Sequence, residues 1–369
     1  MATEGSLAVT LTVARAHVAD VGIVSSRPAR AARALAGRSD DDVLRLVPLL
    51  FPVCGVAQTV ACARAIGAAR GAPGDARREQ ARDLVCLMEA AVAHAWQLAI
   101  SWPEAAQAPS DVGVVRTARA ALATLCAALF EGGSVERPLR APPSLSAARD
   151  AVAQVVAVLE RLTTGDATLL VAVHAASGAA FGAAATNTVA SLDVAKIGAL
   201  LAADPDWAER PELDGAPIDV SAYARRREDE AVRTAEALHG PGLLARLLAR
   251  RAEAESCARR LRERFAAFEL GADTAGPSSP VGCNVAGHGV GHADTARGLL
   301  VYAVRVASAA GVIEDVRVVA PTNWTFHPKG ALHRALVGAA AGLALARNAA
   351  WLVLALDPCV PCTIEVHHA

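Results

Sequence analysis

The chain of 369 residues carries 36 basic and 37 acidic side chains, and 53% of its residues are hydrophobic. It is too apolar to be disordered and long enough for one large domain or two to three smaller ones. The formal net charge of −1 supplies no field that attracts a polyanion. Composition therefore predicts neither a nucleic-acid partner nor an acidic membrane surface.

The first 20 residues lack the basic and apolar regions of a signal peptide. The longest apolar run, residues 335–356, is interrupted by Arg347 and Asn348, and its pieces are too short to cross about 30 Å of hydrocarbon. We therefore expect a soluble, cytoplasmic protein with no membrane partner.

The chain begins with a predicted β-hairpin at residues 1–25, because residues 7–13 alternate in polarity and a second strand-like run follows. Residues 26–270 are predicted to be mainly helical. Helices are expected at 42–50, 57–70, 76–100, 112–130 and 145–163, a buried helix or helix pair at 169–192, and one amphipathic helix with a solvated face at 225–264.

The last part, residues 276–369, has a different character. A Gly-rich loop is expected at 276–298, strands at 299–306 and 312–319, and a last helix at 331–356 before a Cys-x-x-Cys terminus. The prediction is a single domain over 1–369, mainly α with small β elements.

Eight cysteines without a signal peptide do not indicate a disulfide framework. Cys86, Cys126 and Cys257 lie at helical spacing among apolar residues and are expected to be buried thiols. The terminal Cys359-Val-Pro-Cys362 could bind a soft metal, form a redox pair or supply half of a zinc site. A thioredoxin-like pair needs a helix that starts at the first cysteine, and only seven residues follow Cys362.

Six segments, read in chain order, resemble motifs of the large subunit of nickel-iron hydrogenases. They are EGSL at 4–7, LAGR at 35–38, PVCGVA at 52–57, ARGLLVYAV at 296–304, VVAPTNWTFHPKG at 318–330 and LDPCVPC at 356–362. Each motif is weak by itself, but the shared order is specific. The resemblance implies a helical-bundle core like that of the hydrogenase large subunit, in a truncated form.

The departures from the family pattern concern the nickel half of its metal site. Three of the four family thiolates match Cys54, Cys359 and Cys362, but the fourth, which bridges the two metals, is Ala57. Ala61 replaces a histidine, and Ala32 replaces an acid that helps to hold magnesium in the family. The resemblance therefore implies no magnesium, no dependable nickel site and no hydrogenase activity.

The iron half of the family site is kept. The resemblance implies that Arg297 donates hydrogen bonds to cyanide, that the segment of Pro321 and Thr322 does so from the other side, that Leu300 lines a pocket for carbon monoxide, and that Asp357 holds Arg297. Glu4, which matches a proton-relay glutamate, and the terminal His367 and His368 are possible accessory groups. In the family the histidine expected after the last cysteine is at the position of Glu365.

This combination is similar to the large-subunit-like accessory proteins of the HupK/HoxV type. The resemblance implies a scaffold that transiently holds an Fe(CN)2(CO) unit and passes it to the hydrogenase large subunit. Its expected partners are a HypC-type chaperone, the HypD/HypE machinery and that large subunit. Two alternatives stay open at this point: an active or regulatory hydrogenase with a remodelled site, and a metal-free homologue that acts through its surfaces.

Other residues near these motifs have structural interpretations. His288, His292 and His327 lie in a Gly-rich segment and a turn, where histidines are more often hydrogen-bonded than metal-bound. Trp324 is expected to be a packing anchor.

Overall fold

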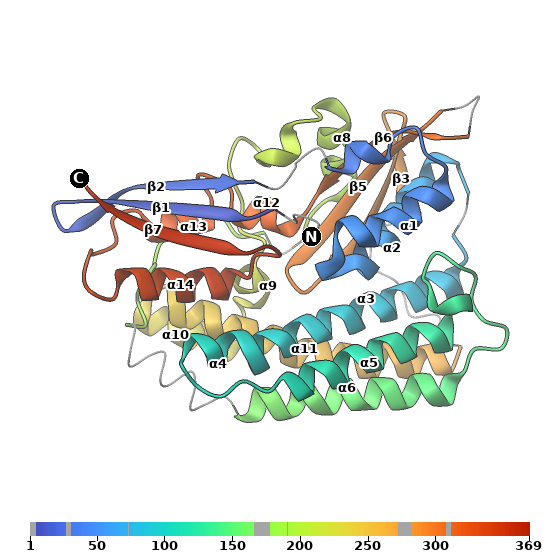
Figure 1. Ribbon diagram of the computed structural model, residues 1–369, viewed down its shortest axis with the longest axis horizontal. Helices are drawn as coiled ribbons and strands as arrows, with labels where there is room; N and C mark the ends of the chain where they lie inside the picture. Colours follow the sequence, from blue (N-terminus) through green and yellow to red (C-terminus); the bar gives the residue numbers. More distant parts are fainter. Residues whose placement is uncertain are drawn as a thin grey trace.

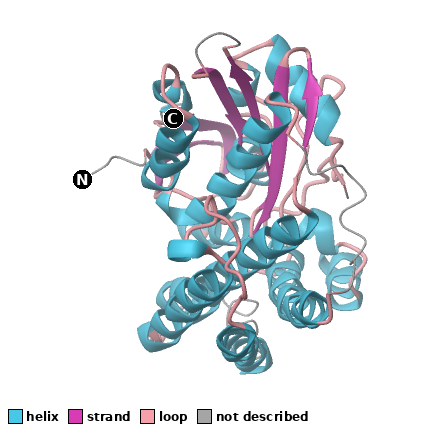
Figure 2. Cartoon of the chain, turned by 90° about the vertical axis from the view of Figure 1, so that its right-hand side faces the viewer, coloured by secondary structure: helices cyan, strands magenta, loops and turns pink. Residues whose placement is uncertain are grey.

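Helices dominate the fold, and two small sheets lie on one side of a layer of long helices (Figures 1 and 2). The computed structural model describes residues 5–26, 31–72, 74–165, 178–189, 191–271, 282–307 and 311–369. The predicted class, mainly α with small β elements, is confirmed.

The first sheet joins the two ends of the chain (Figure 1). Strands β1 (Leu7–Ala14) and β2 (His17–Ser25) form the predicted hairpin, and its turn residues Arg15 and Ala16 both have positive φ, as a two-residue turn of type I′ requires. Strand β7 (Cys362–His368), which the sequence analysis did not predict, pairs in parallel with β1. This pairing fixes the Cys-x-x-Cys terminus against the start of the chain.

The predicted last helix, residues 331–356, is wrong in its middle. It consists of α13 (Ala331–Leu336) and α14 (Leu345–Leu356), which are separated by an irregular segment. Gly338 has a φ of +79° and donates its N–H to the carbonyl of Val18, while Ala339 accepts from the N–H of Val18. Backbone bonds to the hairpin therefore replace the helical bonds of this stretch.

The second sheet has the order β3-β4-β5-β6, and all its neighbouring strands are antiparallel. Strands β5 (Gly298–Val306) and β6 (Ile313–Val319) confirm the two predicted strands. The Gly-rich loop expected at 276–298 is wrong over its described part, since β3 (Gly282–Val285) and β4 (His288–Thr295) form a hairpin there. Residues 276–281 lie outside the described part of the chain.

The glycines of β4 have a packing role. A Cβ atom at Gly289 would lie 2.1 Å from the carbonyl oxygen of Ala65, and one at Gly291 would lie 2.3 Å from the nitrogen of Ala65. Since real Cβ atoms do not approach so closely, these glycines allow the strand to lie directly on helix α2.

The helices predicted before residue 165 are confirmed, with small shifts at their ends. They are α1 (Asp40–Leu50), α2 (Gly55–Ala69), α3 (Ala76–Trp96), α5 (Val112–Leu129) and α6 (Leu145–Gly165). Ser39, Asp75 and Asp111 accept backbone N–H bonds at the starts of α1, α3 and α5. After α3, a π-helical turn (Gln97–Ser101) leads into the short α4 (Trp102–Ala105).

Two helix predictions in the second half of the chain are wrong. The expected helix at 225–264 consists of α9 (Ala222–Arg226), α10 (Glu230–His239) and α11 (Leu243–Glu269), because Gly240, with a φ of +76°, and Pro241 end α10. Helix α11 is also packed on most sides, and its Arg246 and Arg250 are buried. The predicted helix or helix pair at 169–192 is irregular over residues 178–189. Residues 169–177 and 190 lie outside the described part of the chain.

The remaining described helices hold the second sheet and the site in place. Helix α8 (Val194–Ala203) packs on β4 and β5, and the short α12 (Pro321–Thr325) follows β6. Helices α3, α5, α6 and α11 form the layer of long helices, in which α5 packs on α6 and α11 packs on α3 and α6 (Figure 1).

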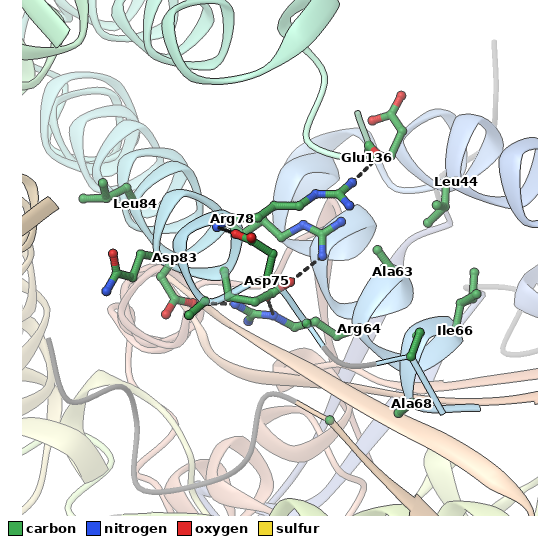
Figure 3. Close-up of a pocket in the computed structure, with 18 of the residues that line it drawn as sticks. Leu44, Ala63, Arg64, Ile66, Ala68, Asp75, Arg78, Asp83, Leu84 and Glu136 are labelled. Atoms are coloured by element: carbon green, nitrogen blue, oxygen red, sulfur yellow. Dashed lines mark hydrogen bonds and ion pairs between the residues drawn. The ribbon is translucent and has the colours of Figure 1, made fainter. Parts of the chain in front are cut away.

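A group of buried ion pairs, which we call the Arg64 cluster, fixes α2 to α3. Arg64 pairs with Glu79 at 2.7 Å and with Asp83 at 2.8 Å, and Arg82 pairs with Glu79 at 2.6 Å. Arg64 also donates to the carbonyl of His292 in β4. Figure 3 shows Arg64 and Asp83 of this cluster at the wall of a cavity of about 780 Å³, where Arg78 donates to the backbone of Glu136.

Among the described residues, three helical stretches are long and apolar enough to cross a membrane by length and composition alone: Pro52–Ala69, Ala76–Ala105 and Val112–Leu129. In this fold the second stretch, which holds α3, is 78% buried against the rest of the protein. Its apolar residues are thus explained by packing within the chain.

Candidate functional site

The site lies where the junction of α1 and α2 meets the end of α14. Cys54 ends a short 3-10 turn (Pro52–Cys54) and is the residue before the first turn of α2. Asp357 ends α14 in a left-handed conformation, with a φ of +55°, and this turn directs the chain toward Cys359. Residues about 300 positions apart in the sequence therefore share one site.

Cys54 and Cys359 form a pair of thiols in this site. Burial raises the pKa of the Cys54 thiol to about 12, and the neighbouring Cys359 and Glu89 act in the same direction. A hydrogen bond from Gln58 Nε2 at 3.4 Å and the positive charge of Arg297 oppose this rise. The Gln58 side chain is itself fixed, since its Oε1 accepts from the Tyr302 hydroxyl at 2.5 Å. Cys54 is thus held as a neutral, protonated thiol in the free protein, and a bound cation would be needed to stabilise its thiolate.

Thr322 orients the second thiol. Its hydroxyl donates to Cys359 Sγ at 3.2 Å, and the backbone N–H of Cys359 donates to the same hydroxyl oxygen at 3.4 Å. The preceding Pro321 starts α12, is buried, and lies near Gly298, the residue that follows Arg297. The predicted Pro321 and Thr322 are therefore both at the site.

Asp357 is a buried carboxylate that binds three side chains. Arg297 donates to Asp357 Oδ1 at 3.1 Å and to the Asp357 carbonyl at 3.1 Å, and Arg250 donates to Oδ2. Gln97 Nε2 donates to Oδ1 at 2.5 Å. Burial opposes the ionisation of Asp357, but the two arginines outweigh it and hold its pKa below the usual range. The predicted support of Arg297 by Asp357 is present.

Arg297 connects this carboxylate with the thiol pair. Burial opposes its charge, but Asp357, Cys359 and Cys54 together raise its pKa. Its guanidinium is thus a fixed positive charge next to two potential thiolates, which is the electrostatic environment that a negatively charged metal fragment needs.

Glu89, on α3, lies at the start of α2 beside Cys54. Its carboxylate oxygens accept the N–H groups of Val56 at 2.9 Å and Ala57 at 3.0 Å. Burial raises the pKa of Glu89 to about 7, although these two bonds and Arg297 act against the rise. The carboxylate thus satisfies the free N–H groups of the helix end next to the position where the family has its fourth cysteine.

A cavity of about 990 Å³ opens over the site. Glu89, Gln97, Arg297, Asp357, Cys359 and Cys362 line its polar end. The remaining wall is mainly apolar and includes the partly exposed Val53 and Trp96, with Arg119 stacked over the Trp96 ring at 5.2 Å. The cavity has room for a metal fragment with small ligands.

The structure brings together most of the predicted site residues, but not all. Cys362 lines the same cavity, and burial raises its pKa to about 11, yet no interaction links it to the other two thiols. Among the described residues no three Cys, His, Asp or Glu side chains form a ready ligand set. Three-thiol ligation therefore stays a prediction. Leu300 is fully buried in the core that also contains Ala57, away from the cavity lining, and Glu4 lies outside the described residues.

His367 and His368 are not near the thiols, so their suggested accessory role is wrong for this conformation. Both are exposed on β7, and His367 pairs with Glu365 at 3.3 Å. His367 is on the opposite face of the strand from Cys362, and His368 is six residues along it, about 20 Å away at about 3.3 Å per residue.

The structural interpretation of Trp324 is confirmed. Trp324 is fully buried and packs edge-on against Trp207, with a centroid distance of 5.3 Å. The Nδ1 atoms of His288 and His327 contact protein groups, the Ala286 carbonyl and the Lys329 N–H respectively. For His292 the backbone carbonyl accepts from Arg64, and its ring Nδ1 is buried without a hydrogen-bond partner among the described residues. All eight cysteines are free, and Cys86, Cys126 and Cys257 are buried.

Sequence reasoning missed Glu89, Gln97 and Arg250. Each lies on a helix whose pattern reads as ordinary packing, and each reaches the site only through tertiary structure. The sequence signal for Glu89 and Gln97 was that a polar residue occupies an otherwise apolar helical stretch, whereas Arg250 lies in a helix rich in charged residues and gave no such signal.

Comparison with curated proteins shows relatives along nearly the whole chain. The chain is 30% identical to the hydrogenase expression/formation protein HupK of Azotobacter vinelandii, over 91% of each chain. It is 26% identical to HupK of Rhizobium leguminosarum bv. viciae, over 99% of this chain and 97% of that protein, and 28% identical to HoxV of Cupriavidus necator, over 93% and 92%. Protein-family models give no match.

Solved structures show the same fold. A nickel-iron-selenium hydrogenase variant from Desulfovibrio vulgaris Hildenborough matches with a TM-score of 0.68 and 17% identity, over 94% of each chain. The enzyme from Desulfomicrobium baculatum matches with a TM-score of 0.67 and 15% identity, over 95% of each chain. At this identity the match shows the fold, that of the hydrogenase large subunit, and nothing about activity.

Proposed function

Because the chain belongs to the family of hydrogenase expression/formation proteins that includes HupK and HoxV, we propose that it is a non-catalytic scaffold for an iron fragment. The cargo is an Fe(CN)2(CO) unit, held transiently on Cys54 and Cys359 with Cys362 as a further thiol. The unit then passes to a hydrogenase large subunit. The proposal rests above all on the thiol pair beside Arg297, Thr322 and Asp357.

The chemistry of this site suits such a cargo. Thiolates are soft ligands, and low-spin iron with cyanide and carbonyl ligands is a soft centre. Arg297 offers N–H donors and a positive charge next to both sulfurs, so it can stabilise an anionic fragment through charge-assisted hydrogen bonds. Binding would release the thiol protons, because a metal ligand must be deprotonated.

The surroundings of Ala57 argue against a nickel-iron pair. Ala57 is fully buried, its methyl group cannot bridge two metals, and its N–H is bonded to Glu89. A second metal would therefore lack its bridging ligand. This feature favours the scaffold over an active or regulatory hydrogenase.

The proposal includes cytoplasmic partners. A HypC-type chaperone with the HypD/HypE machinery would deliver the fragment, and the hydrogenase large subunit would receive it. The apolar wall of the cavity, with Val53 and Trp96 partly exposed, offers a contact surface next to the thiols.

The test is infrared spectroscopy with metal analysis of the protein purified from a host that has the maturation genes. We expect cyanide and carbonyl stretching bands and close to one iron per chain, both lost in Cys359→Ala and in Cys54→Ala. Cys86→Ala is the matched control, because that thiol is buried in the core away from the cavity. Absence of the bands in the wild type, or their survival in both site variants, would reject the proposal; nickel with hydrogen uptake would favour the hydrogenase instead.

A further inference from the structure

Gln97 has an unusual position for a side chain of a long helix. The π-helical turn Gln97–Ser101 interrupts the regular α-helical path after α3. The carbonyl of Ala99 accepts the N–H of Asp111, a residue beyond the helix, at 2.8 Å. Turns of this kind often occur at functional sites, because the extra residue redirects a side chain.

The redirected side chain meets Asp357, and the bond defines its orientation. A carboxylate only accepts hydrogen bonds, so the Gln97 amide nitrogen must face Asp357 Oδ1. The amide oxygen is then left over, and it is buried without a hydrogen-bond partner among the described residues. Gln97 is only 8% exposed and lines the cavity.

The charges around Asp357 do not balance. Two arginines, Arg250 and Arg297, share one buried carboxylate, and Gln97 supports that carboxylate without adding charge. The three ionised groups carry a net charge of +1 at the polar end of the cavity. A glutamate at this position would cancel that charge.

We propose that the cavity over Cys359 selects an anionic occupant, and that the neutral amide of Gln97 is the positioning group that preserves this selectivity. The inference deepens the proposed function, since it rests on that site and assigns a charge to its cargo. Small anions and thiolate-bound cyanide complexes belong to the class that the cavity would accept.

Glu89, Glu104 and Arg119 are further charged residues that line the cavity. Glu89 faces the start of α2, where both its carboxylate oxygens accept N–H groups, so the positive end of that helix opposes its charge. Glu104 and Arg119 also line the cavity and have opposite charges. The net positive charge near Cys359 therefore comes from the group around Asp357.

The test uses the metal-free full-length protein and two thiol reagents. Iodoacetate is anionic and iodoacetamide is neutral. The rate of reaction of Cys359 with iodoacetate divided by its rate with iodoacetamide therefore reports the local electrostatic field. The ionised fraction of the thiol cancels, because the same thiolate attacks both reagents. Fragment-ion mass spectrometry separates Cys359 from Cys362.

We expect the wild-type ratio at pH 7 to exceed that of a synthetic peptide of residues 350–369 by about threefold or more, the size of one charge acting through a partly solvated cavity. Gln97→Glu should lower the ratio at least threefold. Gln80→Glu adds the same charge on α3, 17 residues earlier and about 25 Å along the helix, and should leave the ratio unchanged.

Three results would overturn the inference. They are a wild-type ratio no higher than that of the peptide, a folded Gln97→Glu variant with an unchanged ratio, and an equal fall in the neutral Gln97→Leu variant. The comparison of the wild-type protein with the peptide tests the inference even if the Gln97→Glu variant does not fold. Because no iron is needed, failure of this test is distinct from failure of the infrared experiment.

Discussion

Two groups of buried charges border the two largest cavities described, and they differ in balance. In the Arg64 cluster, the buried Arg64 and Arg82 meet two carboxylates, Glu79 and Asp83, so the buried positive and negative charges are equal in number. A third arginine, the partly exposed Arg264, reaches Asp83 at 3.5 Å. At the site, Arg250 and Arg297 share the single Asp357, and two thiols lie beside them.

The difference separates a structural group from a functional one. A balanced buried cluster needs nothing further, and it ties α2, α3 and β4 together. An unbalanced one retains a charge that a ligand can neutralise, at a cost to stability when the ligand is absent. The predictions below test this contrast.

The largest effect is expected in the Arg64 cluster. Glu79→Gln removes one of its two carboxylates and leaves Arg64 and Arg82 incompletely paired, which should lower the free energy of unfolding by about 3–5 kcal/mol in urea titrations. Glu263→Gln, in an exposed pair with Arg259 at 3.9 Å, is the control and should cost less than about 1 kcal/mol. Equal losses in both variants would contradict the structural role.

Asp357→Asn should have a somewhat smaller effect on stability and a larger effect on function. It removes the charge that pairs with Arg250 and Arg297, at a cost of about 3 kcal/mol. Iron per folded molecule should fall to background, whereas the folded fraction of Glu79→Gln should keep its iron. Calorimetry measures the stability and metal analysis measures the iron content of the same samples. A normal iron content in folded Asp357→Asn would show that Asp357 is not part of the iron site.

Glu89 should make stability depend on pH. Its folded pKa, about 7, is above the usual value, so its contribution is most favourable at low pH and is lost as pH rises from about 4.5 through 7. Between pH 5 and 8 we expect a loss of about 1–2 kcal/mol in the wild type relative to Glu89→Gln, a value reduced for solvent screening in the open cavity. Parallel stability curves for the two proteins would show that Glu89 titrates normally.

Ala57→Cys restores the fourth thiol of the family pattern. Because Ala57 is fully buried, the added sulfur should cost about 1–2 kcal/mol in thermal unfolding. We expect the variant to retain nickel after incubation and desalting, while the wild type does not. Nickel retention that is equal in the two proteins would mean that position 57 does not control the second metal.

The smallest effect is expected for a cysteine outside the site. Cys86→Ala should cost about 1 kcal/mol by loss of packing and leave iron content unchanged. A fall in iron for a folded Cys86→Ala sample would show that the division of the cysteines into site and core is wrong.

Part of the site could be predicted because its residues lie in short motifs. Cys54, Cys359, Thr322, Arg297 and Asp357 each belong to a segment with a recognisable order, and all five meet in the structure. Gln97, Glu89 and Arg250 belong to no motif. A polar residue within a long helix has the same local pattern whether it faces solvent or a buried carboxylate.

The errors in the predicted fold have a similar origin. Local pattern predicted one helix over 331–356, but hydrogen bonds to β2 interrupt it near Gly338. Glycines in β4 suggested a loop, whereas their small size serves close packing on α2. Strand β7 is short and bears charged residues, and only its pairing with β1 makes it a strand.

The sequence by itself determined the helical character, the N-terminal hairpin, the thiols and the absence of a cysteine at position 57, since these depend on residue type and local periodicity. Tertiary structure decided that Cys54 and Cys359 form a pair while His367 and His368 lie elsewhere. It also decided that two arginines share one carboxylate with Gln97 beside them. The physical reason is that charge balance and burial depend on neighbours distant in the chain, which no local pattern specifies.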